Sequence, residues 1–251
     1  MEASLLAIFM VSACVFVVLL EHPASALHQS IEDPIVRRWL MGAAMGGTLM
    51  GIVYSPWGQR SGAHLNPFLT MTFFSLGKID RWDAVFYSLA HFAGAAAGVL
   101  VAVAVIGAPV GHGAVNYAVT VPGPAGAWVA FAAEILISLL MITTVLTTSN
   151  TKRLSRYTGL FAGALVAIYI AAESPYSGMS MNPARTLGSA LFADEWTAIW
   201  VYFTAPLIAM LGGGQLFRLR RGAHAVLCAK LHHHNRKRCI FRCNYGEIDG
   251  K

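Results

Sequence analysis

The 251-residue chain is 56% hydrophobic and only 12% charged, which is more apolar material than a soluble core of this size can bury. Its formal net charge of +6 arises at the end of the chain, because residues 218–251 carry +7 and the rest −1. The composition therefore excludes a soluble globular domain, and the charge gives no indication of nucleic-acid binding.

Six stretches nearly free of charge are close to the ~20 residues that a helix needs to cross ~30 Å of hydrocarbon. They are residues 3–20, 38–54, 84–106, 127–147, 158–172 and 197–217. Residues 24–26 (ASA) resemble a signal-peptidase site, but no positive residues precede the first stretch, so we predict a retained helix. Abundant Gly and Ala favour close helix packing, and hence a helical bundle over a barrel.

The distribution of Lys and Arg predicts the orientation. Nine of the 18 lie after residue 217, and six more fall in segments 56–83 and 152–156, on the same side of a six-helix topology. The connection 107–126 has none. By the positive-inside rule both termini are expected in the cytoplasm, with the chain in an inner or plasma membrane.

One motif occurs twice. SGAHLNPF at 61–68 is echoed by SGMSMNPA at 177–184, with 116 residues between Asn66 and Asn182. Each copy follows the second helix of a three-helix set, and since three is odd the second set must be inverted relative to the first. We predict repeat one at about 1–108, repeat two at about 127–217, and a separate tail at 218–251.

The motif explains a helix too short to cross a membrane. Asn is a favoured N-cap and Pro is favoured at the first helical position, so Asn66-Pro67 and Asn182-Pro183 both predict helix starts. The first helix, 67–75, is about 14 Å long at 1.5 Å per residue, roughly half the hydrocarbon thickness. Two such half-helices from opposite faces would meet at the midplane.

The two motifs, SGAHLNPF and SGMSMNPARTLGSAL, together with the duplicated three-helix sets and the glutamates at 2 and 134, resemble the aquaporin (major intrinsic protein) family over residues 2–217. The first motif departs from the family pattern, since Phe68 replaces Ala. The resemblance implies an all-α membrane fold of six transmembrane helices and two half-helices. It also implies a passive channel for water or small neutral solutes, without a cofactor, assembled as a homotetramer in lipid.

The resemblance also implies roles for single residues. Asn66 and Asn182 would donate from their side-chain amides to water at the midplane, since capping uses only the carbonyl and leaves the NH2 groups free. Arg185 matches the filter arginine, which repels cations and hydrogen-bonds solutes. Glu2 and Glu134 match buried carboxylates that accept backbone N–H groups of the two pore loops.

Counting from the motifs as the family does places Gly46, Ile170 and Met179 beside Arg185 in the selectivity filter. A glycine and an aliphatic residue there favour a wide, weakly polar constriction for glycerol, urea or undissociated metalloid acids. Met179 is long enough to refill that space, and Thr186 stands where glycerol-conducting members typically have Asp. The solute therefore stays open.

The tail lies outside the resemblance. Cys228 and His232 are four residues apart, as are Cys239 and Cys243, which would place each pair on one face of a helix at spacings near those of zinc sites. Thiols in the cytoplasm stay reduced, so disulfides are not expected. The alternative is a basic segment lying on anionic lipid, with cysteines reduced or acylated.

Two classes of function remain after the sequence is considered. A passive channel is the first, and a proton-coupled secondary transporter that uses Glu2, Glu134 or Glu173 as proton carriers is the alternative, because inverted repeats and half-helices occur there too. No nucleophile motif such as G-x-S-x-G and no phosphate-binding loop indicates an enzyme.

Overall fold

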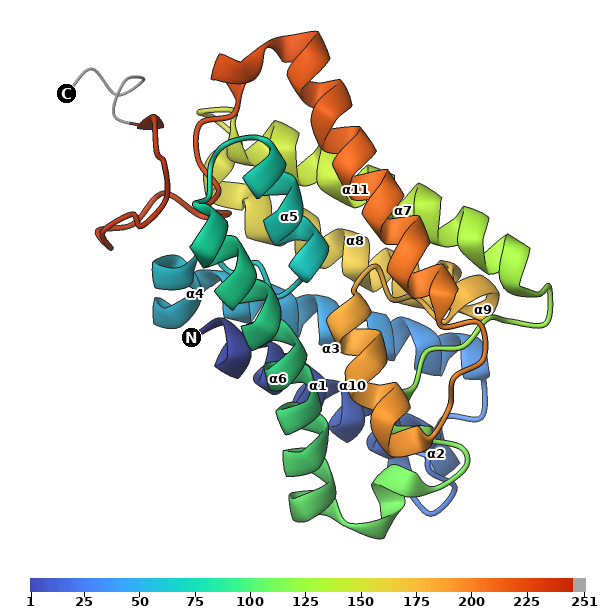
Figure 1. Ribbon diagram of the computed structural model, residues 1–251. Coiled ribbons are helices and arrows are strands. Elements are labelled where there is room, and N and C mark those ends of the chain that lie inside the picture. The colour runs from blue at the N-terminus through green and yellow to red at the C-terminus, as the bar shows by residue number, and fades with distance from the viewer. Residues whose placement is uncertain (246–251) are drawn as a thin grey trace.

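The computed structural model describes residues 1–245, which form helices and loops without any strand (Figure 1). Six long helices build a bundle: α1 (Glu2–Glu21), α3 (Pro34–Tyr54), α6 (Arg81–Ile106), α7 (Ala127–Ser149), α8 (Thr158–Ala172) and α11 (Trp200–Arg221). Two half-helices, α5 (Pro67–Ser75) and α10 (Pro183–Ala193), lie within it. The connections hold the short helices α2 (Ala26–Ser30), α4 (Pro56–Ser61) and α9 (Ser174–Ser177), and the 3-10 turns η1 (Ala108–Gly111), η2 (Asn116–Ala118), η3 (Ser155–Tyr157) and η4 (Ala223–Ala225). Residues 246–251 of the predicted tail lie outside the described residues.

The order of two long helices, a half-helix and a third long helix occurs twice. Within the described residues, five segments are long and apolar enough to cross a membrane by length and composition: α1, α6, α7, residues 155–172 and α11. The predicted span 38–54 belongs to α3, which is 21 residues long but is not among them. Two arginines near its start and four glycines lower its hydropathy.

Helix α3 begins four residues earlier than the hydropathy pattern predicts. Helix α3 starts at Pro34, where the Asp33 side chain accepts a hydrogen bond from the Ile35 amide at 2.7 Å. Arg37 in its first turn is buried, because its guanidinium lies 3.2 Å from the Glu21 carboxylate. A charged residue near a helix end interrupts a stretch of high hydropathy, but the helix itself can continue through that residue.

Glycines let the long helices approach closely. A Cβ at Gly94 of α6 would lie 2.2 Å from the carbonyl oxygen of Ala3 in α1, and one at Gly42 of α3 would lie 2.3 Å from that of Ala167 in α8. Helix α7 packs along α11 in the same way that α1 packs along α6. Each half-helix contacts the last long helix of the other repeat, α5 against α11 and α10 against α6, so the two repeats interlock.

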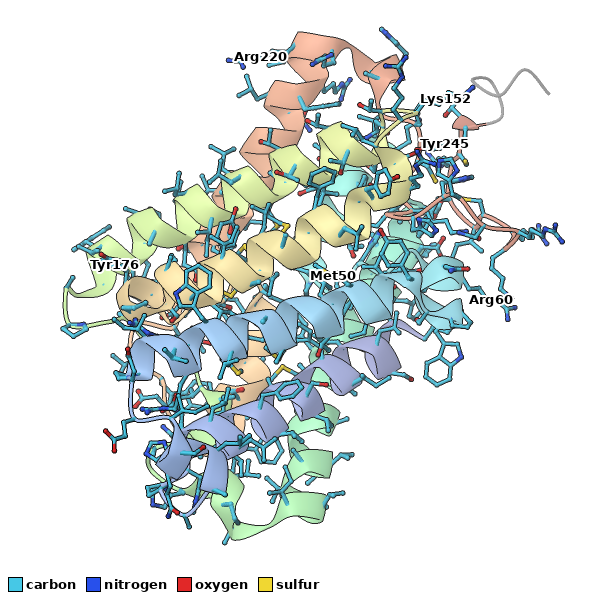
Figure 2. The ribbon with its side chains drawn as sticks, turned by 180° about the vertical axis from the view of Figure 1, so that it is seen from behind. Met50, Arg60, Lys152, Tyr176, Arg220 and Tyr245 are labelled. Atoms are coloured by element: carbon cyan, nitrogen blue, oxygen red, sulfur yellow. The ribbon has the colours of Figure 1, made fainter. Side chains whose placement is uncertain are left out.

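Several basic residues lie at the end of the bundle that carries the tail. Figure 2 shows Arg60, Lys152 and Arg220 toward one end together with Tyr245 of the tail, and Tyr176 at the opposite end. After α11 the chain turns at Gly222 and folds back over that end without a further α-helix up to residue 245. The prediction that the tail cysteines and histidine lie on a helix is therefore wrong.

Candidate functional site

Both half-helices begin at their asparagines, as predicted. The Oδ1 atom of Asn66 accepts a hydrogen bond from the Phe68 amide at 2.8 Å, and Oδ1 of Asn182 accepts one from the Ala184 amide at 3.0 Å. Pro67 and Pro183 occupy the first helical positions, where the missing N–H leaves no partner unsatisfied. Each Asn-Pro pair thus sets the first residue of its half-helix through local interactions.

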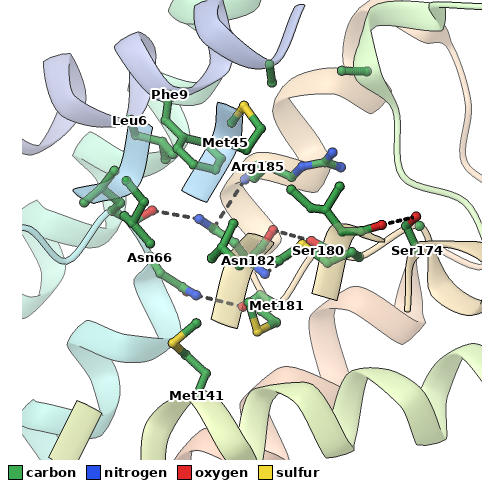
Figure 3. A pocket seen from close by; sticks show the side chains of 18 of the residues that line it. Leu6, Phe9, Met45, Asn66, Met141, Ser174, Ser180, Met181, Asn182 and Arg185 are labelled. Atoms are coloured by element: carbon green, nitrogen blue, oxygen red, sulfur yellow. Dashed lines mark hydrogen bonds between the residues drawn. The ribbon is translucent and has the colours of Figure 1, made fainter. Parts of the chain in front are cut away.

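The two asparagines hold the half-helix tips together. Nδ2 of Asn66 donates to the carbonyl oxygen of Met181 at 2.7 Å, and Nδ2 of Asn182 donates to that of Leu65 at 2.7 Å (Figure 3). The expectation that both NH2 groups stay wholly free is therefore wrong, since one N–H of each crosses to the other loop. One N–H per amide remains, and both asparagines line a common cavity.

The loops that precede the half-helices share an unusual backbone. Positive φ angles occur at Gly62 (101°), Ala63 (57°) and Leu65 (54°), and again at Gly178 (77°), Met179 (52°) and Met181 (55°). Each non-glycine residue in this region costs about 1–3 kcal/mol and persists only where the surroundings fix it. The same conformation in both copies indicates that both loops are held by comparable partners.

Glu134 of α7 holds the second loop. Its fully buried carboxylate accepts hydrogen bonds from the backbone amides of Ser180 at 2.7 Å and Met181 at 2.8 Å, and from the Ser177 hydroxyl at 2.9 Å. A buried carboxylate needs such donors, because its solvation is lost. The loop amides and the carboxylate therefore satisfy one another.

Glu2 of α1 occupies the corresponding place beside the first loop. Its carboxylate accepts from the backbone amides of His64 at 3.3 Å and Leu65 at 2.9 Å, and lies 2.8 Å from Nε2 of buried His91. The two glutamates are thus engaged with loop backbone, and neither lines the cavity.

A tyrosine and a threonine also tie each loop, and of these four residues the sequence considerations above named only Thr186, for its place in the motif. The hydroxyls of Tyr87 and Tyr202 donate to the carbonyl oxygens of Ser61 and Ser177, at 2.7 and 2.6 Å. Thr70 contacts His64 Nδ1 at 2.9 Å, and Thr186 contacts the Ser180 hydroxyl at 2.5 Å. Thr70 and Thr186 are 116 residues apart, the same offset as the asparagines, so extending the repeat comparison along the chain would have found them.

A cavity of about 370 Å³ runs past the tips of the half-helices. Of the predicted filter residues, Ile170, Met179 and Arg185 line it together with both motif asparagines. Figure 3 shows Met45 and Arg185 beside Asn182. Nη1 of Arg185 is buried without a hydrogen-bond partner in the described part of the chain. The cavity thus combines apolar walls with a few unengaged donors.

Gly46, which was predicted for the filter, does not line the cavity. A Cβ at Gly46 would lie 2.4 Å from the carbonyl oxygen of Gly163, so this residue faces α8, while its neighbour Met45 lines the cavity. Met45 stands 21 residues before Asn66, whereas the family count assumes 20.

Phe68 packs into the apolar core. Its side chain is 6% exposed and clusters with buried residues that include Leu69 and Phe73 of the same half-helix. The bulky replacement in the first motif therefore adds to the packing of α5 against the bundle.

The tail brings three of the four predicted metal ligands together. Cys228, Cys239 and Cys243 form a group with His233, in which the ligand atoms all lie within 4.8 Å of one another. His232 is not part of this group, because its ring packs edge-on against Tyr54 with centroids 4.8 Å apart. His233 rather than the predicted His232 therefore lies beside the cysteines, since the irregular tail does not follow a helical spacing.

An all-helical bundle of two similar halves, with half-helices meeting tip to tip at a buried cavity, defines an inverted-repeat membrane protein. A family profile described as Major intrinsic protein matches residues 2–217. The chain belongs to this family.

Curated relatives and a solved structure agree with this membership. The chain is 33% identical over 186 residues to Aquaporin NIP2-3 of Zea mays, covering 74% of this chain and 60% of the relative. It is 37% identical over 174 residues to Aquaporin NIP6-1 of Arabidopsis thaliana, covering 68% and 55%. The fold is similar to that of the aquaglyceroporin from Plasmodium falciparum, with a TM-score of 0.66, 17% identity, and coverage of 86% and 92%. The matched region spans little more than half the length of these plant relatives.

Proposed function

We propose that the chain is a passive transmembrane channel for water and small neutral solutes. The observation that carries the proposal is the meeting of two Asn-capped half-helix tips at one cavity, with an unpaired Arg185 guanidinium N–H beside them. The relatives matched by the chain are named aquaporins. The comparisons give no support to a coupled transporter.

The arrangement favours uncharged solutes for electrostatic reasons. The N-termini of α5 and α10 carry positive partial charge and point at each other, and Arg185 adds a full charge. A cation entering the cavity meets three positive groups, while a neutral molecule meets hydrogen-bond donors. The remaining amide hydrogens of Asn66 and Asn182 orient water oxygens toward themselves, which interrupts a proton-conducting chain.

The residues beside Arg185 set the solute size in this proposal. We assign the filter to Met45, Ile170, Met179 and Arg185, which replaces the earlier expectation of Gly46. Three apolar side chains and one donor group suit a small molecule that has hydroxyls as well as carbon. We therefore propose glycerol, urea or an undissociated metalloid acid, with water, as the permeant solutes.

The cellular setting forms part of the same proposal. The Lys and Arg residues at one end of the bundle support a placement of both termini in the cytoplasm, with the chain in the inner or plasma membrane. Family membership supports a homotetramer with one pore per subunit, formed by residues 1–217, and a tail at 218–251. The proposal assigns no reaction and no resident cofactor to the channel part.

Light scattering of proteoliposomes under water, glycerol and boric acid gradients tests the channel. We expect fast shrinkage with water and faster refilling with glycerol or boric acid than in empty vesicles, with flux linear in concentration and independent of a pH gradient. Saturating, pH-driven flux would instead indicate a coupled transporter. Water permeation without glycerol or boric acid permeation would contradict the assigned solutes.

A further inference from the structure

In the tail, four side chains of the kinds that bind metal ions lie close together. The Sγ atoms of Cys228 and Cys239 are 3.4 Å apart, and Nε2 of His233 lies 3.0 Å from Sγ of Cys243. In a tetrahedral zinc site with bonds of about 2.3 Å, sulfur atoms are separated by ~3.8 Å. Small side-chain shifts are therefore enough for these four atoms to surround one ion.

The chemistry of the group favours zinc. Three thiols and one imidazole are a ligand set of structural zinc sites, and four protein ligands complete a tetrahedron without an open position. Hard cations such as Mg²⁺ and Ca²⁺ prefer oxygen ligands, which this group lacks. With the tail in the cytoplasm, as proposed above, the thiols stay reduced.

The segment that carries the ligands is also bonded to the bundle. Backbone amides of the tail donate to three of its connections: Leu227 to Asn150 Oδ1 at 2.6 Å, Leu231 to the Gly62 carbonyl at 3.2 Å, and Arg242 to the Lys78 carbonyl at 3.1 Å. In sequence, these three residues alternate with members of the Cys-His group. An ion in the group would therefore fix the tail in the position that it has here.

In that position the tail reaches one end of the cavity. Leu231 is 4% exposed and lines the same cavity as the motif asparagines. His64, a residue of the first pore loop, contacts the Ala229 carbonyl oxygen through Nε2 at 2.8 Å. The ring of Phe241 stacks on His64, with centroids 5.5 Å apart and planes 5° from parallel. Tail residues thus cover the pore loop from the side of the charged end.

We propose that the tail binds one zinc ion through Cys228, His233, Cys239 and Cys243, and that the loaded site holds Leu231 and Phe241 across this end of the pore. The zinc-binding part stands independently, whereas the effect on permeation rests on the channel function proposed above. Removing the ion removes a four-point cross-link, so the tail leaves the pore end more often and permeability rises.

Metal analysis of the purified full-length chain tests the binding site. We expect one zinc per chain, and replacement by cobalt(II) should give thiolate-to-cobalt charge-transfer absorption with the spectrum of a tetrahedral ion. Cys239→Ser and His233→Ala should each weaken zinc binding at least about ten-fold. The matched controls Cys14→Ser, a buried cysteine of α1, and His232→Ala, the neighbouring histidine, should keep the ion.

Several results would overturn the site. One is purified wild type that contains no zinc, and another is a disulfide between Cys228 and Cys239 instead of a bound ion. A third is loss of zinc in His232→Ala but not in His233→Ala. Cobalt spectra of variants with matched size-exclusion profiles separate a missing ligand from a misfolded chain.

Water permeability of proteoliposomes tests the closure of the pore. Treatment of the zinc-loaded wild type with a membrane-permeant zinc chelator should raise permeability several-fold, while Cys239→Ser should already be permeable and not respond. Unchanged wild-type permeability after the measured zinc has been removed would overturn the closure. A wild type that conducts in neither state would overturn the channel function and the closure together, while the zinc count would still decide the binding site.

Discussion

The side chains at the centre of the cavity divide into apolar walls and a few donors. Asn66 and Asn182 each keep one amide N–H, and Arg185 keeps an unpaired guanidinium N–H. Met45 and Met179 supply flexible walls that fill irregular space. In the proposed channel, a solute that passes this point exchanges water for these donors, and the two methionines limit its cross-section.

Shortening Met45 tests its place in the filter. Met45→Ala should raise the ratio of glycerol to water permeability several-fold, because the wall beside Arg185 recedes. Gly46→Ala is the matched control, since its new Cβ would meet the Gly163 carbonyl and cost about 1–3 kcal/mol of stability without altering the filter. Stopped-flow light scattering and thermal unfolding measure the two effects. A changed ratio in Gly46→Ala, with none in Met45→Ala, would return position 46 to the cavity.

The sequence predicts the place of a residue correctly where near neighbours in the chain determine it. The prediction fails where contacts with distant parts of the chain determine which way the residue faces. Asn66 and Asn182 are caps because of the proline that follows each, so their place was predictable. Met45 was not predicted to line the cavity, because the residue of α3 that faces the cavity depends on how α3 packs against α8. His233 was missed because tail contacts with the bundle, rather than a helical period, decide which ring meets the cysteines.

At the scale of elements, each half-helix is a short rod held at its N-terminus by a buried glutamate. The bounds of α5, Pro67–Ser75, agree with the prediction because the cap and the following Gly77 act locally. A helix of this length is marginal alone, so tertiary contacts must stabilise it. The strained loop before α10 is fixed by Glu134, whose amide partners lie next to Asn182.

Replacing Glu134 by Gln should therefore loosen the second half-helix. The Gln side chain offers one acceptor oxygen where the carboxylate has two, which leaves a backbone amide of Ser180 or Met181 unpaired at a cost of about 1–3 kcal/mol. We expect a lower thermal midpoint and reduced water permeability. Glu32→Gln, at an exposed position, is the control and should change neither. Equal midpoints for the two variants would show that the carboxylate does not hold the loop.

At the scale of the whole molecule, an apolar surface covers the bundle between two polar ends. Large side chains point outward from several helices, among them Phe86, Val105, Trp128 and Leu136, which are each more than half exposed. In water such a surface would aggregate, whereas lipid or neighbouring subunits can cover it. The end that carries the tail also carries Arg60 and Lys152 (Figure 2), so the two ends differ in charge.

This asymmetry of charge predicts which end faces the cytoplasm, and thiol labelling of intact cells measures it. With both termini inside, a membrane-impermeant maleimide should leave the wild type unlabelled, because Cys14 is buried and the three tail cysteines are on the inner side. Gly113→Cys should be labelled, since it lies in the connection between α6 and α7 at the opposite end and a Cβ there meets open space. Permeabilising the cells with a zinc chelator present should expose the tail thiols to the same reagent. Labelling of the wild type before permeabilisation, with no additional labelling in Gly113→Cys, would contradict this orientation. The tail and its Cys-His group would then lie outside the cell, in an oxidising compartment.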